Sequence, residues 1–183
     1  MSIRYHEADL AAPTRTVGDG VHRLIEYGLE WLAGTLPIDA AVFFTTGRDG
    51  GAFAAPLAIL SDAELDPRML ASAYAGRAAA LDPFAPCRHQ RAATVLLAAA
   101  DVERGAFTAY AEAFLVPFGF ADQTTLFLRS GGRIAAGIAL LRADATPLDA
   151  GQLDLLASTQ PVLEHAYALA LPSRARCDAV PSS

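Results

Sequence analysis

The chain has 183 residues, of which 53% are hydrophobic, and this is enough for one domain with a sizeable core. Its formal net charge of −6 argues against direct binding to a nucleic-acid backbone, which depends on clustered cations. No apolar run reaches the roughly 18–20 residues of a membrane span, and the first residues lack the features of a secretory signal. We therefore expect a cytoplasmic protein that makes no membrane contact.

The first part of the chain predicts a lead-in followed by a helix. Residues 1–16 are polar and mixed, and we expect an extended lead-in there. Asp19 is a candidate helix cap, and Pro37 ends the helix. The apolar residues between them recur at three- and four-residue spacing and form one stripe: Val21, Leu24, Ile25, Leu29, Leu32 and Leu36.

Two strands should follow this helix. Residues 38–46 and 53–60 are rich in apolar side chains, and the segment 48–51 (RDGG) between them is a strong turn signal. Because Pro56 has no N–H to donate to a neighbouring strand, we expect the second strand to lie at the edge of the sheet.

The middle of the chain predicts two more helices with a short strand between them. For the first helix, the segment 61–64 (SDAE) matches a capping box and Asp66, followed by Pro67, is an equally good cap; the helix should run to about Ala80. Residues 94–97 are expected to form the short strand. The second helix should begin near Asp101, with three aromatic side chains on one face at i, i+3 and i+7: Phe107, Tyr110 and Phe114.

The segment 121–144 predicts a β-hairpin, because two apolar runs flank the turn residues Ser130, Gly131 and Gly132. Neither strand alternates cleanly between apolar and polar residues, so both faces of the sheet should be covered. Gly137 and the small residues Ala135, Ala136 and Ala139 would let a helix or a bound molecule come close to the second strand.

A long final helix should follow the hairpin. Asp149 and Gln152 form a candidate cap pair, and one apolar stripe follows it: Leu153, Leu156, Gln160, Leu163, Tyr167 and Leu171. Pro161 lies inside this stripe and is expected to kink the helix or to divide it in two. Residues 172–183 show no apolar periodicity and are interpreted as a tail or linker.

This order of elements predicts an α+β fold with an antiparallel sheet that helices cover on both faces. Part of the sequence resembles the N-terminal GAF-like sensor domains of LuxR-type transcription regulators. The resemblance rests on the run from Tyr110 to Gly119 (YAEAFLVPFG), on the strand end from Ala139 to Arg142 (ALLR), and on the closing residues Leu153, Leu156, Pro161 and Leu163.

The resemblance covers about residues 20–171 and implies a GAF/PAS-like fold, with a lead-in at 1–16, a sensor domain at 17–171 and a tail at 172–183. It also implies a domain that senses a small molecule, dimerises and regulates transcription. Regulators of this type bind DNA through a C-terminal helix-turn-helix, and this module is absent from the chain, so we expect DNA contact only through such a module.

Aromatic residues of the middle helices suggest where a small molecule would bind. One interpretation of Phe84, Tyr110, Phe114, Phe118 and Phe120 is ordinary core, because aromatic stripes at helical spacing usually pack against a sheet. The other is an apolar pocket beside the hairpin, in which Gln123 and Thr125 supply polar groups. The candidate ligand-binding residues are Phe84, Tyr110, Phe114, Phe118, Gln123 and Thr125.

Two other classes of function remain as alternatives: a small cysteine-dependent redox enzyme on a GAF fold, and a protein-interaction domain without a pocket. Cys87 and Cys177 lie far apart in the sequence and form no CxxC motif, which favours reduced thiols. Cys87 and His89 alone are too few for a zinc site. We therefore expect no metal, no cofactor and no enzymatic activity.

The terminal helices are candidates for pairing two copies of the chain. Trp31 lies off the main apolar stripe of the first helix, so its side chain is available to a second copy. The expected partners are therefore an unidentified small molecule and a second copy of the chain.

Overall fold

The computed structural model describes residues 2–5, 19–46, 53–61, 65–90 and 94–170. Six antiparallel strands form one sheet in the order β1-β3-β2-β6-β5-β4. They are β1 (Ser2–Tyr5), β2 (Ala40–Thr46), β3 (Phe53–Ser61), β4 (Leu96–Ala98), β5 (Asp122–Ser130) and β6 (Arg133–Arg142). The predicted central hairpin is β5 and β6, and both of its strands lie inside the sheet.

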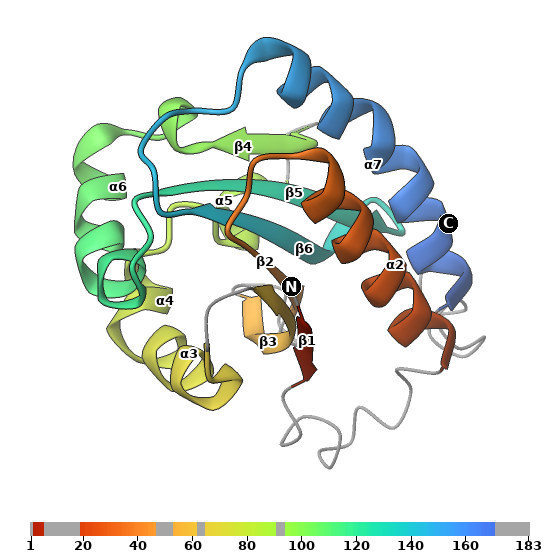
Figure 1. The fold of residues 1–183 in the computed structure, drawn as a ribbon, viewed down its shortest axis with the longest axis horizontal. Coiled ribbons are helices and arrows are strands. Elements are labelled where there is room, and N and C mark those ends of the chain that lie inside the picture. Colours follow the sequence, from red (N-terminus) through yellow and green to blue (C-terminus); the bar gives the residue numbers. More distant parts are fainter. Residues whose placement is uncertain (1, 6–18, 47–52, 62–64, 91–93, 171–183) are drawn as a thin grey trace, which may run out of the picture.

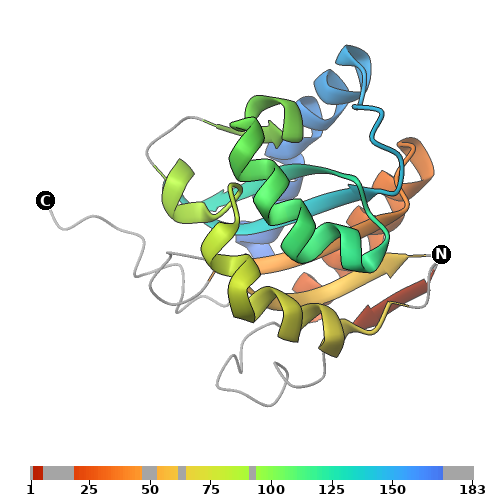
Figure 2. The same cartoon turned by 90° about the vertical axis from the view of Figure 1, so that its left-hand side faces the viewer.

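Helices cover both faces of this sheet, as the sequence predicts (Figure 1). The terminal helices α2 (Asp19–Thr35) and α7 (Ala150–Ala170) pack side by side on one face. The middle helices α3 (Pro67–Ala73), α4 (Ala79–Leu81), α5 (Pro86–His89) and α6 (Arg104–Tyr110) lie on the other (Figure 2). Short helical turns extend α3 and α6: η1 (Tyr74–Ala78), η3 (Ala111–Leu115) and η4 (Val116–Phe118). The predicted α+β class is therefore confirmed.

Alternation along β5 divides the interior into two cores. Leu126 and Leu128 face the terminal helices, whereas Phe127 faces the middle helices. All three side chains are buried, so neither face of the strand meets solvent. This confirms the expectation that the hairpin is covered on both sides. The interior therefore consists of two apolar layers, one on each face of the sheet.

The sheet has one strand more than the sequence analysis predicted. Residues 2–5 are extended, as expected, but they pair with residues 58–61 of β3. The expectation that β3 forms the edge is therefore wrong, because β1 lies outside it. Pro56 is tolerated because the β1 pairing ends at Ala58, and on the other side the register with β2 shifts next to Pro56.

Several helix boundaries follow the predicted caps. The Asp66 carboxylate accepts a hydrogen bond from the Arg68 N–H (2.8 Å), with Pro67 in the first turn. Asp149 and Gln152 bond reciprocally to each other's backbone N–H, at 2.8 and 2.9 Å. The helix α7 continues through Pro161 without being divided.

Other local predictions are wrong or fall on residues that the structure does not describe. Asp101 bonds the N–H of Ala98 instead of capping a helix, and α6 begins at Arg104. The predicted turn at 48–51 and the tail at 172–183 lie outside the described residues. Among the described residues, no helix combines the length and the apolar character of a membrane span.

The β5–β6 turn and the opposite end of the hairpin fix its register. Gly131 and Gly132 have φ values of 58° and 77°, which side chains disfavour and a two-residue hairpin turn requires. At the far end, Asp122 and Arg142 lie opposite each other in the ladder and form a buried ion pair.

Gly137 allows close approach, but the group that approaches is the Phe53 side chain of β3 and not a helix or a bound molecule as expected. A Cβ atom built on Gly137 would lie 2.6 Å from the Phe53 ring. That ring also packs on Phe44, with centroids 5.3 Å apart, and stacks on Phe127 at 6.4 Å. A methyl group here would therefore push the Phe53 ring against Phe44 and Phe127.

We predict that Gly137→Ala lowers the free energy of unfolding by roughly 1–3 kcal/mol, the usual cost of overpacking a core. In a Phe53→Leu background the same change should cost clearly less, because the clashing ring atoms are gone. Urea unfolding of the four proteins in this cycle measures the coupling. Simple addition of the two single effects would contradict the proposed contact.

Candidate ligand-binding site

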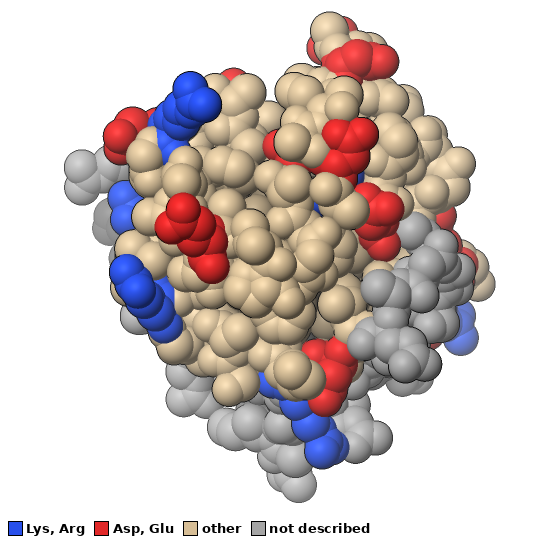
Figure 3. Space-filling model, turned by 60° about the vertical axis from the view of Figure 1, so that its left-hand side comes forward, with Lys and Arg blue, Asp and Glu red and all other residues tan. Residues whose placement is uncertain are grey.

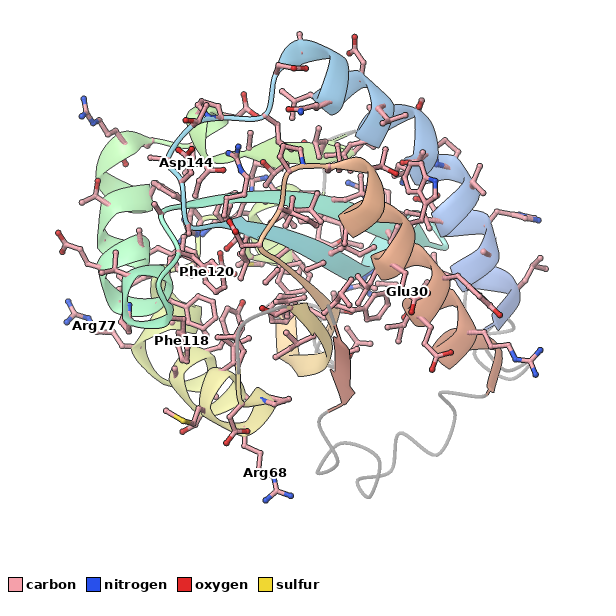
Figure 4. The ribbon with its side chains drawn as sticks, viewed as in Figure 1. Glu30, Arg68, Arg77, Phe118, Phe120 and Asp144 are labelled. Carbon is pink, nitrogen blue, oxygen red and sulfur yellow. The ribbon has the colours of Figure 1, made fainter. Side chains whose placement is uncertain are left out.

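The six predicted site residues come together in the core beneath the middle helices. Phe84, Tyr110 and Phe114 are at most 2% exposed, and Gln123 and Thr125 at most 3%. Phe118 is half-buried at the end of the same helical segment. In Figure 4, Phe118 and Phe120 lie at the turn between this segment and the sheet, whereas Arg68 and Arg77 project outward.

Ring contacts connect the aromatic members of the cluster. Phe114 contacts Tyr110 and Phe118, with centroid distances of 5.5 and 5.8 Å. Tyr110 also meets Phe84 edge to face at 6.0 Å. Pairs at these distances contribute beyond the area that they bury. The spacing of Tyr110 and Phe114 along one helical face therefore places them as predicted.

A chain of hydrogen bonds crosses this aromatic layer. The Tyr110 hydroxyl donates to Gln123 Oε1 (3.0 Å), and Gln123 Nε2 donates to Thr125 Oγ1 (2.9 Å). The alternation of a strand brings Gln123 and Thr125 to the face of β5 that carries Phe127. Burial raises the pKa of Tyr110 well above its ordinary value, so its hydroxyl stays protonated as a donor.

Two donors of this hydrogen-bond chain, one on Gln123 and one on Thr125, are left unused. Within the described part of the protein, Thr125 accepts from Gln123 but has no acceptor for its own hydroxyl proton. The second N–H of the Gln123 amide likewise has no acceptor among these residues. Buried donors normally have an acceptor, so the Thr125 end of this hydrogen-bond chain is suited to an acceptor on a bound molecule.

A second buried polar pair, which the sequence analysis missed, lies in the same layer. Asp82 is 1% exposed; its carboxylate accepts hydrogen bonds from the Tyr74 hydroxyl (2.6 Å) and from the Phe84 N–H (2.8 Å). Asp82 precedes Pro83 in the turn that follows α4, and it is not among the predicted site residues. An Asp that bonds the N–H two residues later is typical of such turns, so this bond had a signal in the sequence, whereas the Tyr74 contact did not.

Cys87, Arg88 and His89 lie on the short helix α5. Cys87 is an exposed free thiol. His89 Nε2 contacts the Pro83 carbonyl oxygen at 2.8 Å, and the imidazole ring packs 5.5 Å from Phe127. Among the described residues, no three His, Cys, Asp or Glu side chains gather in a way that suits a metal ion.

The outer side of the terminal helices carries an apolar groove of about 400 Å³. Tyr27 and Trp31 of α2 line it together with Val162 of α7, and these three side chains are 71%, 43% and 70% exposed. Small residues, Gly28 and Ala166, also contribute to the lining. Large rings therefore stand beside a hollow on a single face.

The side of the molecule that carries the middle helices also has exposed apolar side chains. Met69 and Val116 are 63% and 60% exposed there. Figure 3 shows a broad uncharged area with acidic and basic side chains scattered around it. This side therefore offers an exposed apolar position against which changes in the groove can be compared.

Comparisons with known proteins identify the fold. No family model and no curated protein matches the sequence. The VqsR LBD domain from Pseudomonas aeruginosa matches 89% of this chain and 97% of its own, with a TM-score of 0.56 and 15% identity. A domain assigned to a two-component sensor histidine kinase of Sinorhizobium meliloti 1021 covers 81% and 91%, with a TM-score of 0.56 and 13% identity.

A red/green cyanobacteriochrome, NpR6012g4 in its red light-absorbing state, is a third structural neighbour. It covers 82% of this chain and 96% of its own, with a TM-score of 0.54 and 13% identity. At these identities the likeness is one of fold. The chain shares the fold of these domains, and the predicted GAF-like fold is confirmed.

The buried carboxyl group of Asp82 predicts a pH dependence of stability. Desolvation raises its pKa from 3.8 to about 6, although the bonds from Tyr74 and Phe84 and the charge of Arg88 act in the opposite direction. The folded state therefore holds this proton more tightly than the unfolded state. The resulting stabilisation is complete below pH 3.8 and is lost as the pH rises through about 6.

We predict that Asp82→Asn removes this dependence, because an uncharged amide can take the place of the carboxyl group: its oxygen accepts from the Phe84 N–H, and its NH2 donates to the Tyr74 hydroxyl oxygen. The difference in unfolding free energy between variant and wild type should grow in favour of the variant by on the order of 3 kcal/mol from pH 4 to pH 7. Urea titrations across this range measure it, with Asp154→Asn, an exposed position on α7, as the control. Parallel curves for Asp82→Asn and wild type would contradict the assignment.

Proposed function

We propose that this chain is the small-molecule-sensing and dimerisation domain of a LuxR-type transcription regulator. The observation that carries the sensing role is the Tyr110, Gln123, Thr125 chain, which is buried inside an aromatic layer yet ends on donors without a described acceptor. A self-contained core has no need of such a chain, since apolar residues of similar size would fill the space.

The surroundings of this chain define the class of ligand. Aromatic rings enclose it, so most of the ligand surface should be apolar or aromatic. An oxygen or nitrogen acceptor on the ligand would satisfy the Thr125 hydroxyl and the free Gln123 N–H. The proposed ligand is therefore a small, largely apolar molecule with at least one acceptor.

The regulatory context rests on two lines of support. The first is the sequence resemblance to the sensor domains of LuxR-type regulators. The second is the shared fold with VqsR LBD and with the sensor kinase domain. Under this proposal the domain acts on DNA through a helix-turn-helix module outside the present sequence, and the terminal helices pass on the state of the ligand site.

A thermal-shift screen of small apolar and aromatic metabolites tests the sensing role. A compound that binds only the folded state adds about 2.7 kcal/mol at a hundredfold excess over Kd, which gives a clear rise in Tm. We expect at least one compound to stabilise the wild type, and Gln123→Ala to weaken that shift because it removes the polar contact.

Phe114→Ala and Phe43→Ala form a matched pair for this screen. Both rings are at most 2% exposed, but Phe43 lies in the core on the terminal-helix side. Each truncation should cost roughly 3–5 kcal/mol. Only Phe114→Ala should change the ligand-induced shift. A library that stabilises nothing, or a shift that Phe43→Ala alters equally, would count against this site.

The groove between α2 and α7 supports the dimerisation role. A two-fold dimer requires a surface that complements itself, so protruding groups and the hollows that receive them must lie on the same face. The rings of Tyr27 and Trp31 protrude beside a hollow lined partly by Gly28 and Ala166. We therefore assign this face to a second copy of the chain, with α2 and α7 of each copy in contact.

A single charge in the groove should separate the two copies. We predict that wild type sediments as a dimer and that Val162→Glu sediments as a monomer at the same concentration, because a carboxylate would be buried without a partner. Met69→Glu is the control, since Met69 is comparably exposed but lies on α3, on the other side of the sheet. A dimer that survives Val162→Glu but is lost with Met69→Glu would place the interface elsewhere.

A further inference from the structure

The end of β5 contacts two elements that lie on opposite faces of the sheet. The ring of Phe127 belongs to the aromatic layer of the candidate site. Its backbone carbonyl faces α7 and accepts a hydrogen bond from Gln160 Nε2 (3.1 Å). The pairing of β5 with β6 shifts register between Leu128 and Arg129, so a bulge interrupts the regular ladder here.

On the side of the ligand site, Arg129 holds the α5 segment. Its guanidinium donates to the carbonyl oxygens of His89 (3.2 Å), Gln90 (3.3 Å) and Thr94 (3.4 Å), and to that of Gly132 in the hairpin turn (3.2 Å). The Gln90 side chain in turn bonds both backbone groups of Ile134 in β6. Arg129 is half-buried, because these carbonyls surround it.

On the other side, two side chains of α7 continue the hydrogen-bonding of β5 where β4 no longer does. At this edge of β5, the Phe127 N–H donates to the carbonyl oxygen of Val95, the residue before β4 (2.9 Å). Further along the strand, Gln160 Nε2 donates to the Phe127 carbonyl oxygen, and Glu164 Oε2 accepts from the Arg129 N–H (3.0 Å). Gln160 and Glu164 also bond each other, which links their two contacts.

We propose that this bulged segment, residues Phe127–Arg129, couples the ligand site to α7, an inference that rests on the proposed sensing function. A ligand that moves α5 or the ring of Phe127 must shift Arg129 or the Phe127 carbonyl, and both are bonded to α7. Because these bonds come from side chains and not from a continuous strand, they break one at a time at modest cost. The helix α7 thus has two states, bonded to β5 or released from it, and the occupancy of the site selects between them.

The coupling is testable without a ligand, because linkage is reciprocal. Hydrogen exchange measured by mass spectrometry reports the opening of α7 (residues 156–168) and of the α5 segment (residues 83–90). We expect Arg129→Gln to speed exchange in α7 by about threefold or more, and Glu164→Leu to speed exchange in the α5 segment by a similar factor. Gln160→Leu provides a second α7 variant in case Glu164→Leu fails to fold.

Two conservative variants serve as controls. Arg133→Gln changes an exposed arginine on the same hairpin and should leave exchange in α7 as in wild type. Glu164→Gln keeps an oxygen acceptor for the Arg129 N–H and should restore near wild-type exchange in the α5 segment.

Effects confined to the mutated side would overturn the coupling: Arg129→Gln acting only on α5, and Glu164→Leu only on α7. Such a result leaves the sensing proposal intact. A failed ligand screen, conversely, leaves the exchange experiment valid, so the two proposals fail separately.

Discussion

The need to bury both faces of the central hairpin determines the rest of this fold. A strand in which Leu126 and Phe127 point to opposite sides cannot leave either side in water, so the chain must supply two apolar layers. The terminal helices supply one and the middle helices the other. Each layer is too thin to be stable without the sheet between them, because a helix buries its apolar stripe only against a partner surface.

Burial on both faces also confines polar groups that the same strands carry. The chain pairs them with one another: Asp122 with Arg142 across the hairpin, and Gln123 with Tyr110 and Thr125 inside the aromatic layer. The first pair is complete and serves the register of the hairpin. The Tyr110, Gln123 and Thr125 group retains donors that have no acceptor among the described residues. This difference separates a structural polar pair from a candidate recognition site.

Local signals in the sequence predicted most of the elements and the helical face on which Tyr110 and Phe114 lie. Cap residues such as Asp66 and Asp149, the paired glycines of the turn and the helical spacing of Tyr110 and Phe114 act over a few residues, so they can be read without the fold. The contacts that were missed join distant segments. Tyr74 with Asp82, Phe53 over Gly137, and α7 bonded to β5 depend on how elements pack, and no short pattern records that. The edge position predicted for β3 was wrong because the missing N–H of Pro56 affects pairing only locally. The pairing with β1 begins two residues further along, at Ala58.

The strand β1 has a consequence for how the protein is handled outside its natural context. It covers residues 58–61 of β3, a stretch that includes Ile59 and Leu60 and would otherwise present unpaired backbone groups. Uncovered apolar edges of this kind recruit strands from neighbouring molecules. A fragment trimmed to begin at α2 would keep the residues of both cores, yet it would lack β1 and would expose this edge of β3. Loss of β1 would then be seen as aggregation rather than as unfolding.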